Sequence, residues 1–162
     1  MILAPHGGTI EPGTARLTAA IAGDALSFYA FEALRAGAHG DLHITSHRFD
    51  EPRALRLVEG AETAVALHGR RDDGTETVWL GGRATALRDR IGAALRAAGV
   101  AAEPNDALPG LHARNICNRT RSGAGVQLEL PRSLRRRLTA DPAALEAFAA
   151  AVRGAVLSAF PT

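Results

Sequence analysis

Apolar and polar residues follow one another along this chain in short blocks, and the period of the blocks changes between that of a helix and that of a strand. The clearest helix covers residues 83–98 and ends at Gly99. Within it, Leu87, Ile91 and Leu95 form one apolar stripe. A glycine after such a stripe is a common helix terminator. This segment therefore predicts an amphipathic helix with one buried face.

The other blocks predict an alternation of strands and helices. A short apolar segment leads into His6, and Asn105 opens a polar loop that extends to Ser122. Further helices are expected over residues 14–22, 52–58, 133–138 and 142–159, and strands over residues 27–31, 41–46, 64–67, 76–80 and 125–130. Such an alternation is typical of an α/β fold. We therefore predict a single domain over residues 1–162, with a mixed, mostly parallel sheet and helices on both faces.

Histidines stand at the ends of two predicted strands, each followed by glycine. His6 closes the first strand with Glu11 in the turn behind it, and His68 closes the strand at 64–67. Ligands of α/β sheets bind beyond the carboxyl ends of the strands. Neutral imidazole and carboxylate are good zinc ligands, and three protein ligands leave a fourth position open for water. The arrangement indicates a zinc site; the plainer alternative is that His-Gly-Gly only forms a tight turn.

The composition limits what else can hold a metal or a partner. The chain has 162 residues, 46% of them hydrophobic, which is enough to bury a core. Its single cysteine, Cys117, excludes an internal disulfide and a cysteine zinc cluster. All basic residues are arginines, at a net charge of +2, which fits either an anionic ligand or solvated faces. Because no basic stripe alternates with aromatic residues, we expect no nucleic-acid partner.

The sequence predicts no contact with a membrane. We find no apolar run long enough to span a bilayer and no basic-then-apolar signal segment at the start. The expected compartment is therefore the cytoplasm, or the cytoplasm of a host cell. Met1 lies only five positions before His6, which makes the first strand short and is compatible with a native start further upstream.

Several blocks of the sequence resemble the poly-γ-glutamate hydrolase family, which includes phage depolymerases and chromosomal relatives. They occur in the family's order and cover nearly the whole chain. The blocks are His6–Glu11, Leu42–Pro52, Leu67–Gly69, Leu80–Gly82, Asn115–Arg119 and Gly125–Leu130. The resemblance implies a zinc-carboxypeptidase-like fold and a hydrolase, with one zinc per chain, that opens the γ-amide between glutamates.

The resemblance also implies roles for individual residues. His6, Glu11 and His68 match the metal positions of the family, and Glu129 matches the general base of carboxypeptidase-like enzymes. The carboxypeptidase pattern places its first histidine and glutamate closer together than His6 and Glu11. The match to the metal position is therefore weaker for Glu11 than for the two histidines. Gln127 and Glu129 share one face of their strand, and this polar face is either part of a site or simply solvated.

An acidic substrate needs fixed cations, and arginine is the suitable type. Arg119 is the first choice because it adjoins Asn115 and Asn118, which could orient an amide or a carboxylate, and Arg48 is the second. The alternatives are ordinary turn chemistry for the asparagines and a local ion pair for Arg48. His47 could contact the substrate, support a ligand or cap a helix.

Two further arrangements remain open. His43 alternates with Thr45 and His47 on one face of the strand expected at residues 41–46, where a shared polar cleft could form. Cys117 could act as a nucleophile with His112, although a lone cysteine among apolar residues is more often an inert small hydrophobe.

The sequence thus favours a zinc-dependent amidohydrolase that acts on an anionic glutamyl polymer. The nearest alternative is a zinc deacylase of small N-acyl amino acids such as N-formylglutamate. A second alternative is a non-catalytic module whose arginines bind an anionic polymer. An open groove lined by arginine would favour the polymer, and a closed pocket would favour the small acid.

Overall fold

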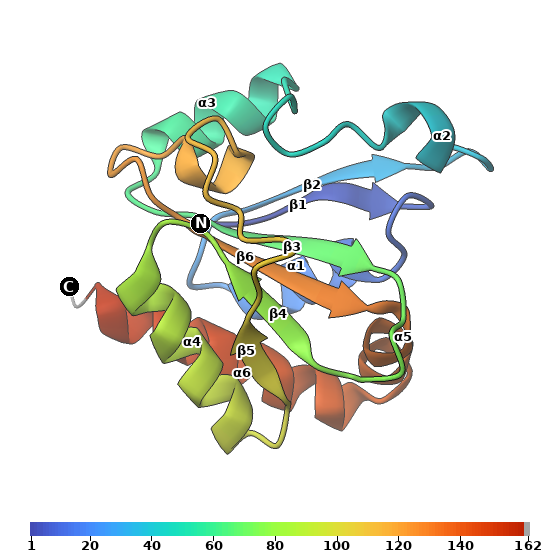
Figure 1. The fold of residues 1–162 in the computed structure, drawn as a ribbon, viewed down its shortest axis with the longest axis vertical. Coiled ribbons are helices and arrows are strands. Elements are labelled where there is room, and N and C mark those ends of the chain that lie inside the picture. The colour runs from blue at the N-terminus through green and yellow to red at the C-terminus, as the bar shows by residue number, and fades with distance from the viewer. Residues whose placement is uncertain (161–162) are drawn as a thin grey trace.

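A six-stranded mixed sheet forms the centre of the computed structural model, which describes residues 1–160 (Figure 1). The strand order is β2-β1-β3-β6-β4-β5, and every neighbouring pair is parallel except β4 and β6. The strands are β1 (Ile2–Gly8), β2 (Phe28–Ala33), β3 (Val65–Arg70), β4 (Val78–Gly81), β5 (Ala102–Pro104) and β6 (Val126–Pro131). This sheet confirms the predicted α/β fold.

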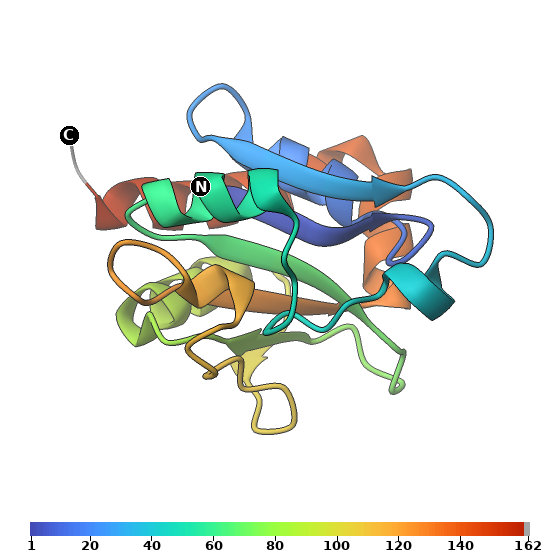
Figure 2. The same cartoon turned by 90° about the horizontal axis from the view of Figure 1, so that it is seen from above.

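Helices cover both faces of the sheet, as predicted, but unequally (Figures 1 and 2). One face carries α1 (Thr14–Ala22), α4 (Thr85–Ala97), α5 (Arg132–Ala140) and α6 (Pro142–Ala159). The other carries α3 (Pro52–Gly60) and a single 3₁₀ turn, η1 (Ile116–Asn118). The one-turn helix α2 (His39–Leu42) lies near the carboxyl ends of β1 and β2.

The alternation of side chains along the strands explains the two unequal cores. Val65 and Leu67 point into the larger core, which is filled from α1, α4, α5 and α6. Ala64 and Ala66 point to the opposite side, where α3 and η1 cover a smaller core. Since successive residues of a strand face opposite sides, His68 continues the alanine row. The carboxyl ends of the strands therefore present polar side chains on the thinly covered face.

The strand predicted at residues 41–46 is wrong. These residues form the end of α2 and an extended segment that joins no strand of the described sheet. Backbone groups of this segment bond elsewhere, since Ile44 O accepts from His6 and Ser46 O accepts from the amide of Ile116. Its alternating pattern thus reflects side chains that face a polar site, rather than a sheet. The pattern also failed to predict β5, a strand of only three residues.

The first strand is longer than its sequence suggested, because it continues past His6 to Gly8. The pairing of β1 with β2 shifts register between Ala4 and Gly7, around Pro5, which has no amide hydrogen to donate. Gly8 has a φ of 67°, and a Cβ there would lie 2.2 Å from the carbonyl oxygen of Ala33. Only glycine fits this position, so the strand end that carries His6 has a fixed path.

Helix α6 corrects the expectation that no apolar run could span a bilayer. It has 18 residues with a mean hydropathy of 1.2, which by length and composition alone would suffice to cross a membrane. Much of that hydropathy comes from alanines, which give the segment no visible long apolar run. Phe148, Val152 and Val156 of α6 are buried in the larger core. The helix therefore serves as a core element of this fold.

The core role of α6 can be tested at Phe148. Its side chain is fully buried in the larger core, so Phe148→Ala should lower the free energy of unfolding by about 3–5 kcal/mol. The matched control is Phe28→Ala, because Phe28 is 52% exposed on β2. We expect the control to change stability by about 0.5 kcal/mol or less in the same denaturant titration. Equal losses would contradict the placement of Phe148.

Candidate metal centre

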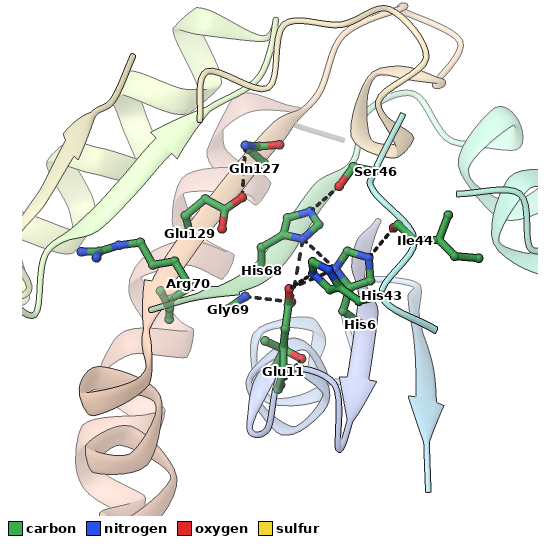
Figure 3. Close-up of polar contacts among 12 residues, drawn as sticks. His6, Glu11, His43, Ile44, Ser46, His68, Gly69, Arg70, Gln127 and Glu129 are labelled. Atoms are coloured by element: carbon green, nitrogen blue, oxygen red, sulfur yellow. Dashed lines mark hydrogen bonds and ion pairs between the residues drawn. The ribbon is translucent and has the colours of Figure 1, made fainter. Parts of the chain in front are cut away.

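Three of the predicted site residues meet at the carboxyl ends of β1 and β3 (Figure 3). His6 lies on β1, Glu11 on the turn that follows it, and His68 on β3. Nδ1 of His6 lies 3.1 Å from Oε1 of Glu11 and 3.3 Å from Nδ1 of His68. Nδ1 of His68 lies 3.9 Å from Oε2 of Glu11. All three side chains are buried.

The turn between β1 and α1 brings Glu11 back to His6 despite their separation in sequence. The amide of Glu11 donates to the carbonyl of His6 at 2.8 Å, and the hydroxyl of Thr14 donates to the carbonyl of Glu11 at 2.9 Å. On β3, the amide of Gly69 donates to Oε2 of Glu11 at 2.8 Å. The five-residue separation of His6 and Glu11 is longer than in the carboxypeptidase pattern. The hydrogen-bonded turn nevertheless brings the Glu11 carboxylate next to the His6 ring.

Hydrogen bonds also fix the orientation of the two imidazoles. Nε2 of His6 lies 2.7 Å from the carbonyl oxygen of Ile44, and Nε2 of His68 lies 3.3 Å from Oγ of Ser46. A carbonyl oxygen can only accept, so Nε2 of His6 donates to Ile44, and Nδ1 is the nitrogen that faces Glu11 and His68. A second partner of this kind is a usual accompaniment of metal-binding histidines.

This donor set fits a tetrahedral zinc ion. Atoms bound to zinc at about 2.0–2.1 Å in a tetrahedron lie roughly 3.3 Å apart. The three potential ligand atoms lie within 4.8 Å of one another, and two of the separations given above are close to that ideal. Two nitrogen atoms and a carboxylate oxygen facing one another in a buried space favour a cation between them. His6, Glu11 and His68 can therefore hold a metal.

The protonation states of the group also suit a metal. Burial alone would raise the pKa of the Glu11 carboxyl, but hydrogen bonds from His43 and His6 and the nearby His68 hold it well below its usual range. Burial lowers the pKa of His68 to about 4, against an opposing attraction by Glu11. At neutral pH, Glu11 is thus ionised and His68 is neutral, as metal ligation requires.

Glu129 stands beside this group on the neighbouring strand. It pairs in register with His68 across β3 and β6, and its side chain is only 8% exposed. Nε2 of Gln127 donates to Oε1 of Glu129 at 3.3 Å. Burial and the charge of Glu11 raise the pKa of Glu129 to about 8. A carboxyl whose pKa lies near neutrality can both take and return a proton.

His6, Glu11, His68 and Glu129 line one cavity of about 440 Å³. Asn115 and His47, for which the sequence analysis predicted a role in substrate binding, also line it. Nδ2 of Asn115 donates to Oε1 of Gln127 at 2.9 Å. Since Gln127 donates in turn to Glu129, a chain of hydrogen bonds links Asn115 to the Glu129 carboxyl. The far wall is the loop of residues 107–112, whose Leu108 and Leu111 are exposed.

The other predicted substrate contacts lie outside the cavity. Oδ1 of Asn118 accepts from the amide of Gly125 at 3.0 Å, and its Nδ2 donates to the carbonyls of Gly110 and His112, so this side chain is occupied in holding the loop. Arg119 forms an ion pair with Glu59 of α3 at 2.7 Å. Arg48 is exposed and does not line the cavity.

Cys117 does not fit the role of a nucleophile. Its thiol is fully buried in the smaller core. Burial raises the pKa of Cys117 to about 12, so the thiol remains protonated at neutral pH. His112, the base considered for it, is instead exposed and faces His47, with 5.0 Å between the ring centres.

Two further residues lie at the site: His43, which the sequence placed only on a shared polar face, and Arg70, to which it gave no role. Nε2 of His43 lies 3.0 Å from Oε1 of Glu11, and Arg70 lines the cavity with its guanidinium 3.8 Å above the ring of Trp79. The signal for His43 was the spacing of His39 and His43, which places them one helical turn apart, and their rings stack at 4.6 Å. Arg70 follows His68 by two positions, but the direction of its side chain depends on its contact with Trp79 of β4, which the sequence pattern does not reveal.

The site combines donor groups that one class of enzyme uses. Zinc enzymes commonly bind the metal with two histidines and a glutamate, and leave the remaining position for water or substrate. A buried carboxylate beside such a set is the usual proton acceptor. The arrangement at the ends of β1, β3 and β6 is therefore typical of metal-dependent hydrolases.

Comparison with known proteins identifies the family. The model of the family described as poly-gamma-glutamate hydrolase matches residues 1–147. YoqZ, an SPbeta prophage-derived UPF0714 protein of Bacillus subtilis (strain 168), is 37% identical over 141 residues, which is 85% of this chain and 51% of YoqZ. The chain belongs to the poly-γ-glutamate hydrolase family, as the sequence blocks indicated. It spans only 51–58% of the length of the curated relatives that it matches.

Solved structures agree with this assignment. A bacteriophage poly-gamma-glutamate hydrolase superposes with a TM-score of 0.91 at 32% identity, covering 98% of this chain and 83% of that one. YndL, in a form described as apo and zinc-free, superposes with a TM-score of 0.86 at 27% identity, covering 99% of this chain and 85% of that one. The fold is thus shared over almost the whole chain.

The raised pKa of Glu129 predicts a pH dependence of stability in the metal-free protein. An unfolded glutamate loses its proton near its ordinary pKa of 4.5, whereas folded Glu129 keeps it to about pH 8. Between these values the folded state binds more protons, so the contribution of Glu129 to the free energy of unfolding falls as the pH rises. His68 acts in the opposite sense, but only below its ordinary pKa of 6.5.

We therefore expect the metal-free protein to lose about 1–2 kcal/mol of stability between roughly pH 6.5 and pH 8 relative to Glu129→Gln. Denaturant unfolding of both proteins in the presence of a chelator measures the difference, and residues that titrate in both proteins cancel. Parallel pH profiles for the two proteins would contradict the raised pKa of Glu129.

Proposed function

We propose that this protein is a zinc-dependent amidohydrolase that cleaves the γ-glutamyl amide bonds of poly-γ-glutamate. The observation that carries the proposal is the juxtaposition of a buried His–Glu–His group with a buried carboxylate, Glu129, on the adjacent strand. Membership of the poly-γ-glutamate hydrolase family supports the substrate, and the description of one YndL structure as zinc-free supports the metal.

His6, Glu11 and His68 would hold one zinc ion per chain. A zinc ion in such a set polarises the carbonyl of a scissile amide and makes a water molecule acidic near neutral pH. The protein orients the ligand atoms through hydrogen bonds to the other ring nitrogens: Nε2 of His6 bonds to the carbonyl of Ile44, and Nε2 of His68 to the hydroxyl of Ser46. Because these partners are already in place, little reorganisation is needed when the metal binds.

Glu129 would act as the general base and then the general acid. Its carboxylate takes a proton from the attacking water and delivers that proton to the leaving nitrogen, so the amide bond breaks without an expelled anionic amine. Gln127 holds Oε1 of Glu129 by its amide, which leaves the other carboxylate oxygen available. A bound dication nearby favours the ionised form of Glu129 and opposes the effect of burial on its pKa.

The shape of the site favours a polymer over a small acyl amino acid. The cavity has exposed leucines, Leu108 and Leu111, at its rim, and its lining includes the cation of Arg70. A zinc deacylase of small acids such as N-formylglutamate would require a closed pocket. A non-catalytic binding module would not require a carboxylate of raised pKa beside a metal group.

Stoichiometric zinc is the first test of the proposal. Protein prepared without chelator should contain about one zinc per chain, and His68→Ala should lose it, because removing a ligand typically weakens structural and catalytic zinc sites severely. Elemental analysis measures the content. His112→Ala is the matched control, since His112 is an exposed histidine of the cavity wall that is not one of the three potential ligands. Full metal content in a His6→Ala, His68→Ala double variant would exclude this metal site.

A second test separates binding of the metal from catalysis. Glu129→Gln should retain zinc and the fold but lose hydrolysis of a γ-glutamyl substrate by about 10²-fold or more, because an amide cannot accept the proton. The matched control is Glu103→Gln, an exposed carboxylate on β5. Unchanged turnover in Glu129→Gln would remove Glu129 from the mechanism, and simultaneous loss of zinc would recast it as a ligand.

A further inference from the structure

A second cavity, of about 450 Å³, adjoins the candidate metal centre. It shares three lining residues with the first cavity: Glu11, Gly69 and Arg70. The two cavities therefore adjoin at Glu11 and at the end of β3, whose Gly69 amide donates to that carboxylate. A chain molecule whose bond is cleaved in the first cavity could continue into the second.

The second cavity is strongly basic. Arg70, Arg71, Arg132 and Arg135 line it, and apart from Glu11 its only acidic residue is Asp72. Arg71 and Arg132 are exposed, and neither forms an ion pair within the part of the chain that the structure describes. Four arginines thus line this cavity with two carboxylates, Glu11 and Asp72, on a protein whose overall net charge is only +2.

Arg135 adds a buried cation that forms no direct ion pair among the described residues, although the charges of Glu11 and Asp72 act on it from a greater distance. Its side chain is 5% exposed, and it donates to the carbonyls of Pro12 at 2.6 Å, Leu130 at 3.2 Å and Arg70 at 3.5 Å. Among residues 1–160, no acidic oxygen lies within 4.0 Å of it. Burying a cation without a counter-ion is costly.

The position of Arg135 links it to the metal centre. A Cβ built on Gly69 would lie 2.6 Å from its guanidinium carbon, so the cation packs directly against Gly69. Gly69 is also the residue whose amide binds Glu11. The positive charge is thus held by backbone carbonyls at the junction of the two cavities, where an anionic ligand could supply the missing partner.

Arg70 plays a different part, because its charge is already matched. Its Nη1 lies 3.0 Å from Oδ2 of Asp73, its Nη2 donates to the carbonyl of Thr77 at 2.9 Å, and Trp79 supports the guanidinium plane. These contacts fix the side chain of Arg70, which lines both cavities. Arg71, Arg132 and Arg135 are the cations that remain for a ligand.

We propose that this second cavity binds the α-carboxylates of γ-linked glutamyl residues beyond the bond that is cleaved. The proposal rests on the proposed function of the metal centre. Each residue of a γ-linked glutamate chain carries a free α-carboxylate, and the guanidinium fork matches a carboxylate with two parallel hydrogen bonds. The consequence is a dependence on chain length: substrates long enough to reach the arginines bind better than a single γ-glutamyl dipeptide.

The test uses Arg71→Gln, Arg132→Gln double-variant protein. Both residues are exposed, so the substitutions should leave the fold intact, whereas loss of the buried Arg135 would disturb its carbonyl contacts. Arg136→Gln is the matched control, because Arg136 is an exposed arginine of α5 that does not line the cavity. Zinc-loaded parent, double variant and control are compared on γ-glutamylglutamate and on long poly-γ-glutamate.

For the long polymer, we expect the double variant to raise KM by roughly tenfold with kcat little changed. The dipeptide should show no difference between the three proteins, and the control should match the parent on both substrates. The advantage of the parent over the double variant should shrink at high salt, because the contacts are between exposed charges. An unchanged KM of the double variant for the polymer would overturn the proposal.

Binding measured without turnover separates this proposal from the proposed function. In a Glu129→Gln background, fluorescence anisotropy of labelled poly-γ-glutamate should show a Kd about tenfold weaker when Arg71 and Arg132 are also replaced. A polymer whose α-carboxylates are amidated should bind weakly and be insensitive to both arginines; equal sensitivity would overturn the proposal. If the polymer binds in this manner but the parent cleaves no γ-glutamyl bond, carboxylate binding in the second cavity is supported and the proposed hydrolase function is contradicted.

Discussion

The site depends on the Glu11 carboxylate, which ties three separate segments of the chain together. Oε1 lies within hydrogen-bonding distance of His6 on β1 and of His43 after α2, and Oε2 accepts from the amide of Gly69 on β3. A buried carboxylate without such partners would be strongly destabilising. The same contacts that make its burial tolerable place its oxygens against two imidazole nitrogens, so the requirements of folding and of metal binding coincide.

The unequal covering of the sheet decides where this group can sit. Large apolar residues of β3 and β6 face α1, α4, α5 and α6, whereas small alanines and then polar residues face α3 and η1. Because the second face is covered only in its amino-terminal part, the carboxyl ends of β1, β3 and β6 open into a cavity. The loop of residues 107–112, which Asn118 holds by hydrogen bonds to Gly110 and His112, forms its outer wall.

Charge is distributed around the site with a clear asymmetry. On one side, the carboxylates of Glu11 and Glu129 are buried close together, which raises the pKa of Glu129 and favours a cation between them. On the other side, Arg71, Arg132 and Arg135 form no direct ion pair among the described residues and outnumber the nearby carboxylates Glu11 and Asp72. The net charge of +2 does not show this separation of charge, because it sums the carboxylates, the unpaired arginines and the paired surface arginines without regard to position.

The sequence by itself determined the α/β fold, all helices longer than one turn, and the grouping of His6, Glu11 and His68 at strand ends, because these depend on local periodicity and on residue types at strand ends. It did not determine the segment at 41–46, where alternation reflected contacts with His6 and not a strand. Nor did it distinguish Arg119, which pairs with Glu59, from Arg70 and Arg135, which reach the cavities. Those assignments were decided only by the tertiary structure, because the direction of a long side chain depends on elements far away in the sequence that pack against it.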